Sequence, residues 1–155
     1  MIPCTDFIPA YSELFAFLEE KGGRRAVQDF WNWLSDAYLG NLRDLVRAQG
    51  IRGCWSYWSH TLNEESADFT MTLDEEAGRF TIEMHRCPSR GLLLRTLQIE
   101  PYHDYCGHCD VLYRRVLEPL GYDVTLDLRH VDEARCSVVI RAKRERTPVS
   151  PPPPG

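Results

Sequence analysis

The sequence lacks the features by which several large classes of protein are recognised. It has no apolar run long enough to cross a bilayer, and its first six residues contain no basic region followed by an apolar stretch. A membrane anchor and a secretory signal are therefore not expected, and we predict a cytoplasmic protein. Basic charge is not in excess, because 18 Lys and Arg residues oppose 23 Asp and Glu residues. The net charge of −5 has the wrong sign for a dedicated nucleic-acid binder.

Other absences narrow the range of ligands and reactions to be expected of this protein. The chain has no internal repeat, no glycine-rich nucleotide-binding loop and no Gly-x-Ser-x-Gly turn of the kind that carries a catalytic serine. Given the acidic balance, the expected partner is a small-molecule substrate or ligand. In a reducing compartment, the six cysteines are expected as thiols, metal ligands or core residues rather than as disulfides.

Length and composition predict one domain. A chain of 155 residues with 43% hydrophobic residues is large enough to bury a single core. We expect this domain to span residues 1–146, followed by a disordered proline-rich tail over residues 147–155. The expected class is α+β, with two N-terminal helices and one later helix packed on a mainly antiparallel sheet of about five strands.

Hydrophobic periodicity gives the positions of these elements. Three- and four-residue spacing predicts helices over residues 11–20, 24–49 and 105–120. Apolar and polar residues alternate in four predicted strands, at about 67–74, 79–87, 122–129 and 136–142. Residues 54–62 are predicted as the first strand from their aromatic and hydroxyl side chains, although Trp55, Trp58 and Leu62 also fit a helix.

The densest chemistry lies in residues 103–110, His-Asp-Tyr-Cys-Gly-His-Cys-Asp, which contain two cysteines, two histidines and two aspartates. Asp104 is a candidate N-cap for the following helix, which places Cys106 in the first turn. Cys106 and Cys109 are three residues apart and are expected on the same side of that helix. The positive end of a helix favours a thiolate there.

Three interpretations of these two cysteines stay open. In the first, both are small packing residues, since free cysteine is often buried. In the second, they form part of a zinc or iron site. No second Cys-x-x-Cys or His-x-x-x-His is present, so the site would have to be completed from a distance by residues among Cys54, Cys87, His60, His85, His103 and His108.

The third interpretation is thiol chemistry, nucleophilic or redox. His103 or His108 would act as the base, and Asp104 or Asp110 would orient that histidine.

Strand parity predicts different environments for two further cysteines, Cys87 and Cys136. Cys87 ends a predicted strand on the face opposite its apolar residues and precedes a proline, which is typical of site residues at strand ends. Cys136 shares parity with the apolar residues of its strand, and we predict it as core. Arg90 and Arg95 are candidates to pair with a substrate carboxylate.

A family resemblance rests on four short motifs. These are Arg86-Cys87-Pro88, Cys109-Asp110 in a helix, Gly121-Tyr122 opening a hairpin, and Cys136 in the last strand. Over roughly residues 54–142 the chain resembles the family of L-2-amino-thiazoline-4-carboxylic acid hydrolase and its relatives. The resemblance implies a small α/β domain and a cysteine-dependent ring-opening hydrolysis of a substrate that contains sulfur and nitrogen. Cys106, His103 and His108 depart from the family pattern.

The expected function is therefore a small cytoplasmic cysteine-dependent hydrolase acting on a thiazoline- or amide-like substrate. Its candidate catalytic residues are Cys87, Cys106, Cys109, His103, His108 and Asp110. One alternative is a zinc- or iron-binding protein that uses Cys87, Cys106, Cys109, His60 and His103. A second alternative is a binding or sensory module without catalysis, whose pocket is lined by Trp55, Tyr57, Trp58 and Tyr105.

Overall fold

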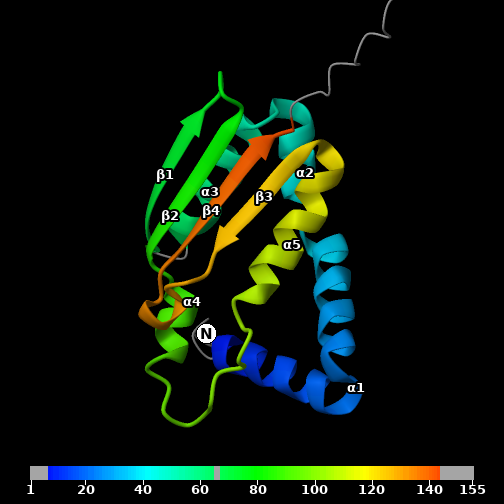
Figure 1. The fold of residues 1–155 in the computed structure, drawn as a ribbon, viewed down its shortest axis with the longest axis vertical. Coiled ribbons are helices and arrows are strands. Elements are labelled where there is room, and N and C mark those ends of the chain that lie inside the picture. Colours follow the sequence, from blue (N-terminus) through cyan, green and yellow to red (C-terminus); the bar gives the residue numbers. More distant parts are fainter. Residues whose placement is uncertain (1–6, 65–66, 144–155) are drawn as a thin grey trace, which may run out of the picture.

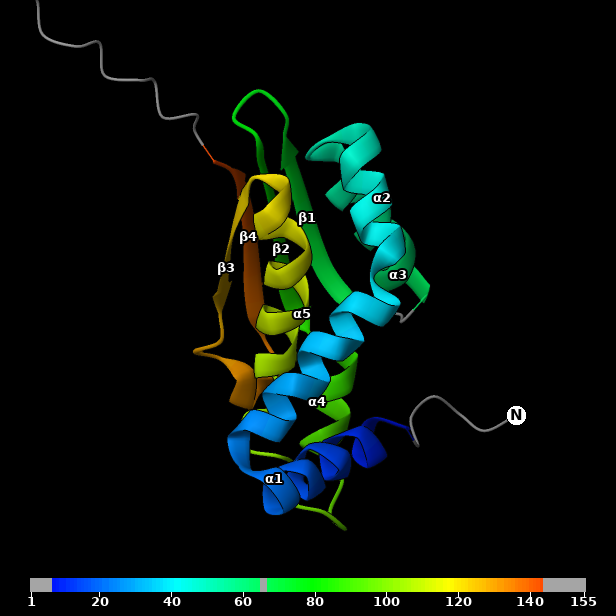
Figure 2. The ribbon, with the colours of Figure 1, turned by 90° about the vertical axis from the view of Figure 1, so that its right-hand side faces the viewer.

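Helices cover one face of a four-stranded antiparallel sheet (Figures 1 and 2). The computed structural model describes residues 7–64 and 67–143, so the predicted tail lies outside the described residues. The strands are β1 (Asp68–Asp74), β2 (Arg79–Arg86), β3 (Tyr122–Asp127) and β4 (Cys136–Ala142), in the spatial order β1-β2-β4-β3. Each neighbouring pair is antiparallel. The predicted α+β class is confirmed.

The helices are α1 (Phe7–Tyr38), α2 (Gly40–Gln49), α3 (Arg52–Glu64), α4 (Pro88–Leu93) and α5 (Gly107–Leu117), with short 3₁₀ turns η2 (Glu118–Leu120) and η3 (Val131–Glu133). α1 bends sharply at Gly23, whose φ of 69° and ψ of −176° are not helical (Figure 1). This bend separates two arms where the sequence predicts two helices. The helix predicted over 24–49 is divided again before Gly40, and α4 was not predicted.

The prediction of a strand at 54–62 is wrong, because these residues lie in α3. The buried positions of that helix include Cys54, Tyr57, Trp58 and Leu62, which follow helical spacing. The Trp58 ring stacks on Phe80 of β2, with ring centroids 5.7 Å apart and an interplanar angle of 22°. Packing of large side chains against the sheet thus outweighs the strand preference of aromatic residues. The sheet consequently has four strands rather than five in the described residues.

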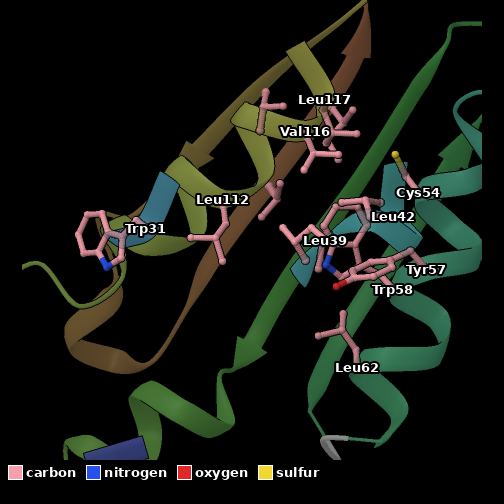
Figure 3. Packing of buried hydrophobic residues seen from close by; sticks show 14 of the residues in the cluster. Trp31, Leu39, Leu42, Cys54, Tyr57, Trp58, Leu62, Leu112, Val116 and Leu117 are labelled. Atoms are coloured by element: carbon pink, nitrogen blue, oxygen red, sulfur yellow. The ribbon is translucent and has the colours of Figure 1, made fainter. Parts of the chain in front are cut away.

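The core lies between the sheet and the helices. Figure 3 shows Leu112, Val116 and Leu117 of α5 on one side, opposite a group from α2, α3 and the turn before α2 that includes Leu39, Leu42, Cys54 and Trp58. Trp31, from the second arm of α1, lies beside α5 in the same view. α5 is therefore held between the sheet and α1, which fixes the position of the cysteine-rich segment at its start.

Candidate active site

A cavity of about 160 Å³ opens beside the start of α5. A cavity of this order accommodates a molecule about the size of benzene. Most of its wall is apolar, with residues that include Trp58, Ile82, Met84, Tyr113 and Val138. Four cysteines complete the wall: Cys87, Cys106, Cys109 and Cys136.

These cysteines come from three different parts of the chain. Cys87 follows β2 and caps α4, where its sulfur accepts a hydrogen bond from the Arg90 backbone N–H at 3.4 Å. Cys106 immediately precedes α5, and Cys109 lies in its first turn. Cys136 begins β4 and pairs in register with Met84 of β2. The predicted grouping of Cys87 with Cys106 and Cys109 is present in this cavity.

Cys136 is the site residue that sequence analysis missed. Its parity places it with the apolar residues of β4, as predicted, and the cavity opens at the end of that same sheet face. Strand parity alone does not show whether the end of a sheet face is filled by packed side chains or borders a cavity.

Cys106 and Cys136 are protonated at neutral pH. Burial, together with negative charge on Cys109 and Cys87, raises the pKa of both thiols to about 12. The Arg90 guanidinium acts in the opposite direction on Cys106. Neither thiol is therefore a thiolate at rest.

Cys109 contacts a histidine. Its sulfur lies 3.5 Å from Nε2 of His108. Nδ1 of the same ring lies within hydrogen-bond distance of the backbone carbonyl of Tyr105. A carbonyl only accepts, so in the neutral ring the proton is on Nδ1, which leaves the lone pair of Nε2 facing the thiol. His108 is thus placed to accept the proton of Cys109.

His108 is neutral because it is removed from water. Although part of the residue remains exposed, the rings of Tyr11, Phe15, Trp31 and Tyr105 surround the imidazole at centroid distances of 5.5, 5.7, 6.4 and 5.0 Å. This burial lowers the pKa of His108, opposed in part by the Tyr105 carbonyl and by the charge of Asp104.

Asp110 is not the residue that orients this histidine. Its carboxylate pairs with Arg114 at 2.6 Å, one turn further along α5. The Tyr105 carbonyl takes the orienting position instead. Asp110 is two residues from His108 on a helix, and residues at that spacing do not face each other.

His103, His60 and Asp104 also lie elsewhere than predicted. Nε2 of His103 is 3.0 Å from Glu19 on α1, and its side chain is exposed. His60 pairs with Glu64 at 3.4 Å on the exposed side of α3. Asp104 does not cap α5, because its carboxylate pairs with Arg24 of α1 and α5 begins only at Gly107. Neither histidine lines the cavity that holds the cysteines.

Two tyrosines lie close to Cys109. Burial raises the pKa of Tyr11 and of Tyr105 well above the usual value, and negative charge on Cys109 would add to both shifts. The Tyr105 hydroxyl also hydrogen-bonds the side chain of Ser89. Both phenols therefore keep their protons. Of the four aromatic residues predicted to line a binding pocket, Trp58 and Tyr105 line this cavity.

The wall of the cavity also contains a cationic side chain, that of Arg90. Arg90 is only 13% exposed, and its guanidinium bonds the Val131 carbonyl at 3.1 Å and Asp132 at 3.3 Å. Its neighbour in the prediction, Arg95, is exposed.

The geometry gives no support to a metal centre. Among residues 7–64 and 67–143, no group of three or more His, Cys, Asp or Glu side chains is arranged to hold a metal ion.

Comparison with protein-family models, with curated proteins and with solved structures finds no match in any of the three. Within the part of the chain that the structure describes, no helix is both long enough and apolar enough to span a membrane.

Proposed function

We propose that the protein is a cysteine-dependent hydrolase of small molecules, with Cys109 as nucleophile and His108 as its base. The observation that carries this proposal is the contact of 3.5 Å between Cys109 Sγ and His108 Nε2 at the wall of a mostly apolar cavity. The Tyr105 carbonyl supports it further by holding the histidine in the tautomer that accepts a proton.

The reaction begins with proton transfer. As the sulfur of Cys109 attacks an electrophilic carbon, Nε2 of His108 takes its proton, so that no free thiolate is needed at rest. The protonated imidazole then gives the proton to the departing nitrogen or sulfur, and the substrate remains bonded to Cys109. Water, deprotonated by His108, attacks this carbon and breaks the bond to sulfur, which restores the thiol.

Tyrosine hydroxyls have a role in these reaction steps. Negative charge develops on the atom attached to the attacked carbon, and donors that keep their protons stabilise it best in a site with little water. Tyr11 and Tyr105 both keep theirs and lie close to Cys109, but of the two only Tyr105 lines the cavity. We assign this role to Tyr105 within the proposal.

The substrate class follows from size and from the family resemblance. A cavity of about 160 Å³ suits a small compound rather than a peptide or polymer. The resemblance to the thiazoline-carboxylate hydrolase family points to a thiazoline-like ring or a small amide, in which a C–N or C–S bond breaks.

Turnover of thiazoline carboxylates and small amides, followed by mass spectrometry, tests the proposal. Cys109→Ser should abolish product formation while the circular dichroism spectrum is retained. His108→Gln should lower the rate by about 10²- to 10⁴-fold. The matched control is His103→Gln, because His103 is exposed and bonded to Glu19; it should keep wild-type turnover. Full activity of Cys109→Ser would overturn the proposal.

The same samples distinguish the two alternative functions. Near one zinc or iron per chain, lost in Cys109→Ser, would favour a metal protein. A compound that binds in the cavity and is recovered unchanged would favour a binding module.

A further inference from the structure

Cys106 and Cys109 form a pair at the start of α5. They are three residues apart, both line the same cavity, and the Cys109 backbone N–H bonds the Cys106 carbonyl at 3.2 Å. Residues at this spacing in a helix have Cβ atoms about 5–6 Å apart. A disulfide needs about 3.5–4.5 Å between Cβ atoms, so the two Cβ atoms must approach by about 1–2 Å, which requires a small movement of the backbone.

Cys106 is the residue of the pair that can make this movement. Cys106 stands before the first residue of α5, Gly107, and its side chain makes no capping hydrogen bond there. Because α5 begins at Gly107, Cys106 can shift toward Cys109 while the helix itself stays in place.

We propose that Cys106 is the resolving thiol of Cys109, so that a hydroperoxide converts the pair into an intramolecular disulfide. The inference rests on the proposed function in one respect: the disulfide switches hydrolysis off because it consumes the nucleophile. The oxidation itself requires only the two thiols and the peroxide.

The atoms and electrons balance in two steps. Cys109 sulfur attacks one oxygen of hydrogen peroxide, the O–O bond breaks, and water leaves with the thiol proton relayed by His108; Cys109 is now a sulfenic acid. Cys106 sulfur then attacks Cys109 sulfur, the S–O bond breaks, and hydroxide leaves with the Cys106 proton as water. Two thiols are oxidised by two electrons in total, and the peroxide is reduced to two waters. An external dithiol reverses the reaction.

The electrostatics of the cavity favour this order of events. A negative charge on Cys109 would raise the pKa of Cys106 more than the charge of any other neighbour. A neutral sulfenic acid carries no such charge, and the charge of Arg90 lowers the pKa of Cys106. The oxidised partner therefore does not oppose deprotonation of the resolving thiol.

The other two thiols of the cavity, Cys87 and Cys136, are less well placed than Cys106 to attack oxidised Cys109. The Cys87 sulfur is held by the Arg90 N–H at 3.4 Å, and Cys136 lies within the β4 ladder opposite Met84. A disulfide between Cys87 and Cys136 is nevertheless the natural rival product, and trypsin separates the two outcomes. Cleavage after arginine yields residues 96–114, which contain Cys106 and Cys109 alone, while Cys87 lies in 87–90 and Cys136 in 136–141.

The experiment treats the reduced full chain with equimolar hydrogen peroxide, blocks remaining thiols with N-ethylmaleimide and digests without reduction. The expected result is peptide 96–114 without N-ethylmaleimide and lighter by two hydrogens, with 87–90 and 136–141 each carrying one label. Peptide 96–114 carrying two labels, or joined to another peptide, would overturn the inference.

Two variants sharpen the result. In Cys106→Ser, dimedone should trap the sulfenic acid on Cys109, whereas the wild type gives little adduct. Cys136→Ala is the matched control and should still form the disulfide; its loss there would make Cys136 the resolving thiol instead. Because the readout is a mass, a disulfide without hydrolysis refutes the proposed function alone, and hydrolysis without a disulfide refutes this inference alone.

Discussion

The hydroxyl of Ser12 accepts a hydrogen bond from the backbone N–H of Tyr102 at 2.8 Å, and both residues are buried. This bond joins the first arm of α1 to the loop that leads into the site. Three residues beyond Tyr102, Tyr105 supplies the carbonyl that orients His108. A polar residue in the core of α1 thus fixes the loop on which the candidate catalytic geometry depends.

The first prediction is that Ser12→Ala destabilises the fold by about 1–3 kcal/mol, because it leaves a buried N–H without an acceptor. Ser35 is the matched control: its hydroxyl donates to the Leu112 carbonyl at 2.8 Å and is equally buried. That carbonyl lies inside α5 and keeps its helical partner, so Ser35→Ala should cost only about 0.5–1.5 kcal/mol. Urea unfolding of the two variants checks the order, and an equal loss would contradict it.

The second prediction concerns the contact between α2 and α3. A Cβ atom at Gly53 would lie 2.6 Å from Val46 Cα and closer still to the Leu45 carbonyl. Backbone atoms cannot yield as a flexible side chain does, so Gly53→Ala should destabilise by about 1–3 kcal/mol or more.

Gly40→Ala is the control for this change, since a Cβ there meets nothing within 4 Å. It should be neutral or stabilise by up to about 1 kcal/mol. Thermal unfolding of both variants gives the comparison, and a neutral Gly53→Ala would show that α2 and α3 are packed less closely than described.

The positions of the four strands could be predicted from the sequence, whereas α3 could not be recognised as a helix. Alternation located β1, β2, β3 and β4, because one face of each is packed and the other is not. Residues 54–62 carry aromatic side chains typical of strands, and only tertiary packing, such as Trp58 on Phe80, makes that segment helical.

The candidate site, too, could be predicted from the sequence only in part. Residues 103–110 stand out in the sequence by their density of cysteine and histidine, and Tyr105, Cys106, His108 and Cys109 of this segment line the cavity. The orienting group was a backbone carbonyl, that of Tyr105, and backbone atoms leave no mark in a sequence. His103 was an equal candidate with His108 until the fold placed it against Glu19.

The third prediction is a loss of stability as pH falls below the ordinary histidine pKa of 6.5. The pKa of His108 in the folded protein lies below that value, so the unfolded chain binds a proton before the folded one does. The free energy of unfolding is therefore at its full value above pH 6.5 and falls as the pH drops from there to the folded-state pKa, by at most about 1.4 kcal/mol per pH unit for one group.

Urea midpoints measured from pH 7.5 to 5 check this dependence. In His108→Gln the slope should be reduced, since Gln does not titrate. The exposed His60 provides the control, and His60→Gln should keep the wild-type slope. An unchanged slope in His108→Gln would assign the pH dependence to other groups.

The fourth prediction tests the charge of the cavity wall. Arg90 is nearly buried and lowers the pKa of Cys106, which places its positive charge near the thiols. An anionic reagent should therefore be favoured over a neutral one of the same size, because opposite charges attract more strongly where water is scarce. The measured quantity is the ratio of the rates at which iodoacetate and iodoacetamide modify Cys109.

Arg90→Gln should lower this ratio several-fold, whereas Arg95→Gln, which removes an equal but exposed charge, should leave it unchanged. The ratio is more informative than either rate, since a change in the nucleophilicity of Cys109 affects both reagents alike and cancels. If both arginine variants lower the ratio equally, the effect comes from the overall charge of the protein, which either substitution makes more negative than −5, and not from the cavity wall. If neither does, Asp132, 3.3 Å from the guanidinium, already neutralises Arg90, and substrate selection rests on the shape of the cavity.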